Sequence, residues 1–149
     1  MPAVVRNIRV EVERSLPWSG TYVYCPTAGM IVATLLIFEL DEDEPRAHRW
    51  KEDGFRRKVG RTPFFDHHTL SINPGETHDL VIIGRAVRFL AHWRLFVDLE
   101  IDGHKKTVMV DDGGDRFCTC GEPPAGFRTR LHWAWYAGGG FAPEPEHPA

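Results

Sequence analysis

The stretch that decides the fold is 87-VRFLAHWRLFVDLEIDGHKKTVMV-110. From Val87 to Ile101 every second residue is apolar, and most of the residues between them are charged or polar. Successive side chains of a strand point to opposite faces, so this period of two predicts a half-buried antiparallel strand over 87–101. A helix would scatter the same apolar side chains around its circumference.

A turn signal follows this strand directly. Asp102-Gly103 stands between two apolar runs, and Gly accepts the positive φ that a type I′ turn requires. We therefore predict a hairpin in which 87–101 pairs with 104–110. In that hairpin Trp93 belongs to the core face, and the opposite face is a solvated sheet surface.

Shorter runs predict further strands. The 31–40 run is apolar on both faces, which is typical of a central strand, and Asn73-Pro74-Gly75 predicts a turn. The additional strands are expected at 8–12, 21–24, 31–40, 70–72 and 80–83.

Together these signals predict an all-β protein. About seven to nine short strands separated by Gly and Pro, without a convincing amphipathic helix, are typical of an antiparallel β-sandwich. We expect an immunoglobulin-like arrangement by fold-level analogy alone, although the antibody-type Cys…Trp…Cys spacing is absent.

The chain has the usual size of one domain, at 149 residues. We expect a single sandwich domain over residues 1–136 and a flexible Gly- and Pro-rich tail over 137–149. The strongly charged connection 41–61 is expected to be a long loop, or to contain a short helix at 46–53.

Charge and hydropathy argue against some classes of function. A net charge of −3 gives no overall attraction to nucleic acid or acidic membranes. The N-terminus lacks the apolar segment of a signal peptide, and the longest apolar stretch, Met30–Phe38, is too short to span a membrane as a helix. Three cysteines give no complete disulfide framework. We therefore expect a cytoplasmic protein with no membrane partner.

The charged connection contains the main candidate binding surface. Between residues 46 and 61, seven basic residues stand against two acidic ones, with aromatic residues among them. Such a segment could neutralise phosphates and stack bases, so nucleic-acid binding is one alternative function, which the acidic run 41–44 disfavours. Tryptophans near the C-terminus form a second candidate surface. The candidate binding residues are Arg49, Trp50, Arg56, Arg57, Lys58, Arg61, Trp133 and Trp135.

Two sets of residues are of types that ligate metals. Cys118 and Cys120 could act with a histidine, but one residue separates them, whereas zinc sites usually have two to four. Asp111, Asp112 and Asp115 share a glycine-rich segment that lacks the EF-hand order. A plain turn explains this segment better.

Catalytic motifs have little support. Asp66-His67-His68 and His78-Asp79 could orient an imidazole as a general base, but no nucleophile elbow, phosphate loop or HExxH motif accompanies them. We expect no catalytic residue and no cofactor, and a metal-dependent enzyme remains an alternative. The favoured function is a non-enzymatic module that binds another protein, with homo-oligomerisation through an open sheet edge as a further expectation.

Overall fold

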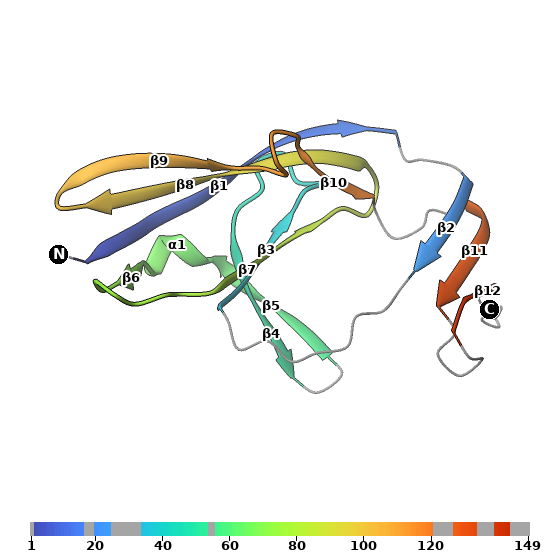
Figure 1. Ribbon diagram of the computed structural model, residues 1–149, viewed down its shortest axis with the longest axis horizontal. Coiled ribbons are helices and arrows are strands. Elements are labelled where there is room, and N and C mark those ends of the chain that lie inside the picture. The colour runs from blue at the N-terminus through green and yellow to red at the C-terminus, as the bar shows by residue number, and fades with distance from the viewer. Residues whose placement is uncertain are drawn as a thin grey trace.

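The computed structural model describes residues 2–16, 20–24, 34–53, 56–120, 127–133 and 139–143 (Figure 1). Within these ranges the chain is mostly β, as predicted, and contains no helix long and apolar enough to cross a membrane. The elements are β1 (Ala3–Ser15), β2 (Gly20–Tyr24), β3 (Thr34–Glu39), β4 (His48–Asp53), β5 (Arg56–Pro63), α1 (Phe64–His67), β6 (Leu70–Ile72), β7 (Leu80–Arg85), β8 (Leu90–Ile101), β9 (His104–Val110), β10 (Phe117–Cys120), β11 (Phe127–Trp133) and β12 (Phe141–Pro143).

The predicted hairpin is confirmed. β8 pairs antiparallel with β9 along the whole of β9. Asp102 and Gly103 connect the two strands with φ angles of 51° and 75°, the left-handed values that a type I′ turn requires. Asp tolerates this region better than most residues, and Gly adopts it at no steric cost, which is why this dipeptide fixes the register.

β8 begins at Leu90, three residues later than the alternation predicts. Residues 87–89 form a bend instead. One carboxylate oxygen of Asp41 accepts hydrogen bonds from the backbone N–H groups of Val87 at 2.7 Å and Arg88 at 2.9 Å. The two amides therefore bond to a side chain and not to a neighbouring strand. For this reason the strand begins later than the alternation of apolar residues.

Five strands form the first sheet. β8 lies between β1 on one side and both β9 and β10 on the other. β1 pairs antiparallel with β8 over its full length, with a bulge between Val5 and Asn7. β9 and β10 lie end to end along the same edge of β8, separated by residues 111–116. β6 pairs only with the start of β1.

Two further sheets contain parallel pairs. β3 is an interior strand of the second sheet, whose order is β5-β4-β3-β7, as its two apolar faces predicted. β3 and β7 are parallel, and so are β2 and β11 in the third sheet, whose order is β12-β11-β2. The prediction of antiparallel pairing throughout is wrong for these two pairs. In both, long stretches of chain separate the paired strands, which is the crossover that parallel pairing needs.

Three other segments differ from the expectation or add to it. The charged connection 41–61 is neither a long loop nor a helix at 46–53, because β4 and β5 form an antiparallel hairpin there. Strand periodicity was hidden because charged side chains occupy the strand positions. The turn at 73–75 is confirmed, with Gly75 at φ 82°, but it joins strands of different sheets. Within 137–149, where a flexible tail was expected, β12 pairs with β11.

The core lies between the first and second sheets. Trp93 is buried, as predicted, and its Nε1 donates to Thr119 Oγ1 at 2.9 Å. β7 passes so close to this ring that a Cβ on Gly84 would lie 2.6 Å from the Trp93 Cζ2 atom. Buried core side chains come from both sheets, the short helix and residues that flank the strands: Val5, Ile8, Leu36, Phe38, Leu40, Ala47, Phe64, Ala86, Ala91, Trp93 and Leu95.

Candidate functional site

One edge of β1 is open over most of its length. β6 covers that edge only at Ala3–Val5, and from residue 7 to Ser15 no other strand in the described ranges pairs with it. Unpaired N–H and C=O groups along a strand edge are a template for another strand. Residues 7–15 therefore offer roughly 30 Å of backbone for pairing.

A groove borders this open edge, and we call it the β1 groove. Its volume is about 440 Å³, which lies within the range of sites that hold ligands. Half-buried Val10 and Val12 line it on the β1 side, and residues 43–47 with Pro63 and Phe65 line it on the other. The groove thus adds apolar side-chain contacts to the hydrogen-bonding groups of the edge.

Hydrogen bonds hold the far wall of the β1 groove in place. Arg14 Nε donates to the carbonyl of Leu40 at 2.6 Å, and Arg14 Nη2 donates to the carbonyl of Glu42. Arg46 forms a two-bonded ion pair with Asp66 of α1. Because side chains from β1 and α1 anchor both ends of this wall, the groove exists before any ligand binds.

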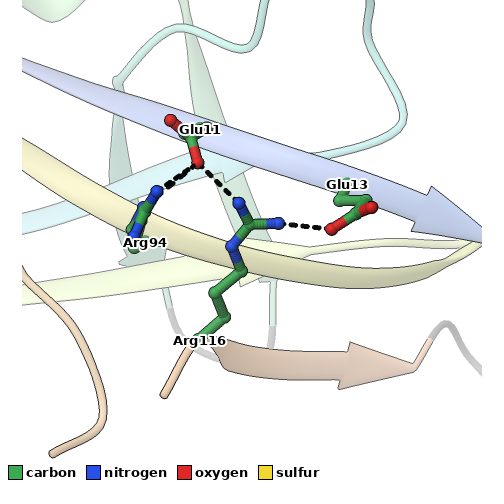
Figure 2. Close-up of polar contacts among 4 residues, drawn as sticks. All are labelled: Glu11, Glu13, Arg94 and Arg116. Carbon is green, nitrogen blue, oxygen red and sulfur yellow. Dashed lines mark hydrogen bonds and ion pairs between the residues drawn. The ribbon is translucent and has the colours of Figure 1, made fainter. Parts of the chain in front are cut away.

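The outer face of the first sheet carries a network of ion pairs (Figure 2). Arg94 of β8 and Arg116 both donate to one carboxylate oxygen of Glu11 at 2.8 Å. Arg116 also bonds Glu13, so it reaches across β8 to β1 from the segment that precedes β10. The network therefore ties residues 111–116 to the first sheet.

A second group of charges lies on the same face. Arg9 donates to Asp98 at 2.9 and 3.0 Å, and Thr107 Oγ1 donates to Asp98 at 2.8 Å. The bond from Arg9, assisted by Thr107 and opposed by partial burial, lowers the pKa of Asp98. Phe96 has the guanidinium groups of Arg9 and Arg94 at 5.5 and 5.9 Å from its ring centroid. The face predicted to be ordinary solvated sheet is an ordered surface whose charges bond one another.

The Asp- and Gly-rich segment is a turn, as predicted. Asp112 and Asp115 exchange backbone hydrogen bonds at 2.9 and 3.2 Å, and Gly113 and Gly114 between them have φ of 64° and 104°. Asp111 accepts a hydrogen bond from the Gly114 amide at 3.0 Å. Only glycine adopts such angles freely, so the segment turns sharply away from the sheet edge and back.

The basic residues predicted as a binding surface lie on the β4–β5 hairpin. Arg49, Lys58 and Arg61 are exposed, and Trp50 is half-buried. Lys51 stands directly opposite Lys58 in the register of the hairpin. The guanidinium of Arg49 lies 5.8 Å from the ring centroid of Phe64.

The other predicted binding residues are placed only in part. Arg56 and Arg57 belong to β5, opposite Asp53 and Glu52, and their side chains lie outside the described part of the chain. Trp133 ends β11, and its side chain is also outside that part, as is the whole of residue 135. The structure therefore brings the six hairpin residues together on β4 and β5.

Residues considered for catalysis have other partners. Asp66 pairs with Arg46 and lies in α1 beside His67, which is exposed. His78 Nε2 lies 3.0 Å from Thr34 Oγ1. No acid–imidazole pair is thus formed by Asp66 within the described residues.

The residues considered for metal binding are not gathered into a site. Cys118 and Cys120 are exposed free thiols. Partial burial, with a smaller contribution from Cys120, raises the pKa of Cys118, which disfavours the thiolate that a metal requires. Across the described ranges no three His, Cys, Asp or Glu side chains are grouped so as to hold a metal ion.

Sequence reasoning expected an open sheet edge but did not locate it at β1. Strand order depends on contacts between distant segments, which a periodicity within one segment does not reveal. One usable signal is lysine at strand positions, because proteins protect sheet edges with charged side chains and with Lys in particular. The edge strand β9 contains Lys105 and Lys106, whereas residues 7–15 contain no lysine. Compared with known proteins, the chain matches no family model, no curated protein and no solved structure.

Proposed function

We propose that this chain is a non-enzymatic protein-interaction module that binds an extended segment of another protein along the open edge of β1. The observation that carries the proposal is that the unpaired edge from residue 7 to 15 borders the preformed β1 groove. Main-chain hydrogen bonds give affinity in such strand addition, and pockets for alternate side chains give selectivity.

The other sheet edges support this choice by contrast. β5 contains Lys58 and β9 contains Lys105 and Lys106, and lysine is the residue most used against unwanted strand pairing, whereas residues 7–15 of β1 contain Arg and Glu but no Lys. β7 has no second partner strand among the described residues, but its residues are not among those that line the β1 groove. β1 combines an open edge with an adjoining groove, whereas β9, which also lines a cavity, carries lysines at its edge.

The proposed fold rests on the arrangement of the sheets. We infer a β-sandwich from the first and second sheets because core side chains come from both. The immunoglobulin-like arrangement remains a proposal by analogy, and the parallel β3–β7 pair counts against it, since both sheets of that fold are antiparallel.

Strand addition can be tested by selecting peptides that bind and then methylating their backbone amides. A library of random twelve-residue peptides is displayed against the whole chain, and enriched peptides are synthesised in two N-methylated forms, each blocking alternate amides. Strand addition uses the N–H groups of one edge of the peptide, so one methylated form should lose binding and the other should keep it. Equal binding by both forms, or no enrichment over a control without protein, would overturn the proposal.

A matched pair of variants locates the site. Val10→Lys places a charge in the β1 groove and should reduce affinity for the selected peptides at least about tenfold. Val59→Lys makes the same change on β5, where the valine is exposed, and should leave affinity unchanged. Thermal unfolding of each variant checks that it is folded. Loss of binding in the β5 variant instead would move the site to the β4–β5 hairpin.

A second candidate function is nucleic-acid binding by the β4–β5 hairpin. The specific observation is that the hairpin carries four exposed basic residues, which could neutralise phosphates: Arg49, Lys51, Lys58 and Arg61. Titration with a single-stranded oligonucleotide at low salt should then show binding that weakens steeply as salt is added. Absence of binding at low salt removes this candidate.

A further inference from the structure

We infer that the segment accepted by the β1 groove is basic, with Lys or Arg among the side chains that point into the groove. This inference rests on the function proposed above and names the chemical class of its partner. It is based on a difference in hydrogen bonding between the cations and the anions that line the groove.

Each arginine of the β1 groove already has acceptors. Arg9 donates to Asp98 on the outer face, and Arg14 donates to the carbonyls of Leu40 and Glu42. Arg46 donates to Asp66. Two of the five N–H groups of each guanidinium are thus engaged within the protein, and carboxylates compensate the charges of Arg9 and Arg46.

The carboxylates that line the groove differ from these arginines in their hydrogen bonding. Asp43 and Glu44 line the groove wall opposite β1 and are exposed. Among the described residues, neither side chain has an ion pair or a hydrogen bond in the structure, in contrast to Asp66, which pairs with Arg46. Each is an acceptor available to a cation, so the groove complements a basic segment and not an acidic one.

The geometry also sets the spacing of the basic side chains. A strand added to β1 points alternate side chains toward the groove and the others toward the outer face. Arg and Lys have long apolar stems, which would lie along Val10, Val12 and Phe65 while their charged ends reach Asp43 or Glu44. A segment that alternates apolar with basic residues therefore fits this site.

Three synthetic peptides test the inference. Each is a fluorescein-labelled nine-residue peptide in which Val alternates with Lys, Thr or Glu. Fluorescence polarisation with the whole chain at low salt should give the order Lys, then Thr, then Glu. Two exposed ion pairs should make the Lys peptide bind about fivefold to tenfold more tightly than the Thr peptide. This difference in affinity should shrink at roughly 0.5 M salt, because salt screens exposed charges.

A double substitution assigns the effect to the two carboxylates. Asp43→Asn with Glu44→Gln removes both charges without changing side-chain shape, and should abolish the preference for Lys over Thr. The control, Asp79→Asn with Asp102→Asn, removes two exposed charges that do not line the groove, and should retain the preference.

The outcomes separate the two proposals. Equal binding of the Lys and Thr peptides overturns the basic preference and leaves strand addition intact, as does a preference that survives the Asp43/Glu44 substitutions. Binding of the Lys peptide that Val10→Lys does not weaken overturns the β1 groove as the site. Binding of none of the three peptides overturns both.

Discussion

A single methyl group at Gly84 should destabilise the protein through contact with the Trp93 ring. A Cβ at this position would lie 2.6 and 2.7 Å from ring atoms Cζ2 and Cε2, and 2.9 Å from Leu40 Cδ1. These distances are shorter than van der Waals contact, so something must shift. Trp93 cannot shift freely because it is buried and its indole N–H is bonded to Thr119.

The size of the effect follows from two opposing contributions. Overpacking of a well-packed core costs about 1–3 kcal/mol. Gly84 is not among the glycines with positive φ, so alanine fits its backbone and restricts the unfolded chain, which returns about 0.4–1 kcal/mol. The free energy of unfolding should fall by about 1–2 kcal/mol, which corresponds to a drop of roughly 2–8 °C in Tm for a chain of this size.

Urea unfolding followed by circular dichroism measures the change, with Gly60→Ala as the control. Gly60 also lies in a strand, and a Cβ there would meet its nearest neighbour, the carbonyl oxygen of Arg49, at an ordinary 3.5 Å. Gly60→Ala should be neutral or slightly stabilising. Wild-type stability of Gly84→Ala, or equal losses in both variants, would refute the packing of β7 on Trp93.

Three further substitutions test other contacts. Gly103→Ala places a Cβ at φ 75° and should cost about 1 kcal/mol in urea unfolding, and a neutral result would contradict the type I′ turn. Asp98→Asn removes the exposed pair with Arg9 and should cost less than about 1 kcal/mol at neutral pH. Because the pKa of Asp98 is lowered, this stabilisation is present above its ordinary pKa and is lost as pH falls through the folded value. Thermal melts of both proteins should therefore converge in strong acid, and a constant difference would be inconsistent with the ion pair. Arg116→Gln should speed amide hydrogen exchange within 111–116, and unchanged rates would show that the network does not hold that segment.

Local signals predicted the elements whose conformation is set locally. The alternation ending at Ile101 and the Asp102-Gly103 turn are properties of neighbouring residues, and the hairpin formed as expected. The start of β8 at Leu90 was not readable, because it depends on Asp41, nearly fifty residues away in sequence. The same holds for the parallel β3–β7 pair, whose strands are brought together by the core.

The β1 groove could not be predicted for a related reason. Its two walls, β1 and residues 43–47, become neighbours through contacts between distant segments, among them the bonds of Arg14 and Arg46 and the packing of Ala47 in the core. The sequence does contain the acidic run 41–44 and the basic run after it, and both were recognised as charged. Which of those charges are neutralised depends on the groups that lie next to them in the folded chain. The inferred preference for a basic segment rests on that pairing.

Amide hydrogen exchange along β1, measured by NMR with and without the Val–Lys peptide, tests the central claim most directly. In the free protein, amides between residues 7 and 15 that point toward β8 should exchange slowly, and the alternate amides at the open edge should exchange fast. Saturating peptide should slow the fast set and leave β9 unchanged. Uniformly slow exchange along β1 before peptide is added, or fast exchange that persists after peptide is bound, would contradict strand addition at this edge.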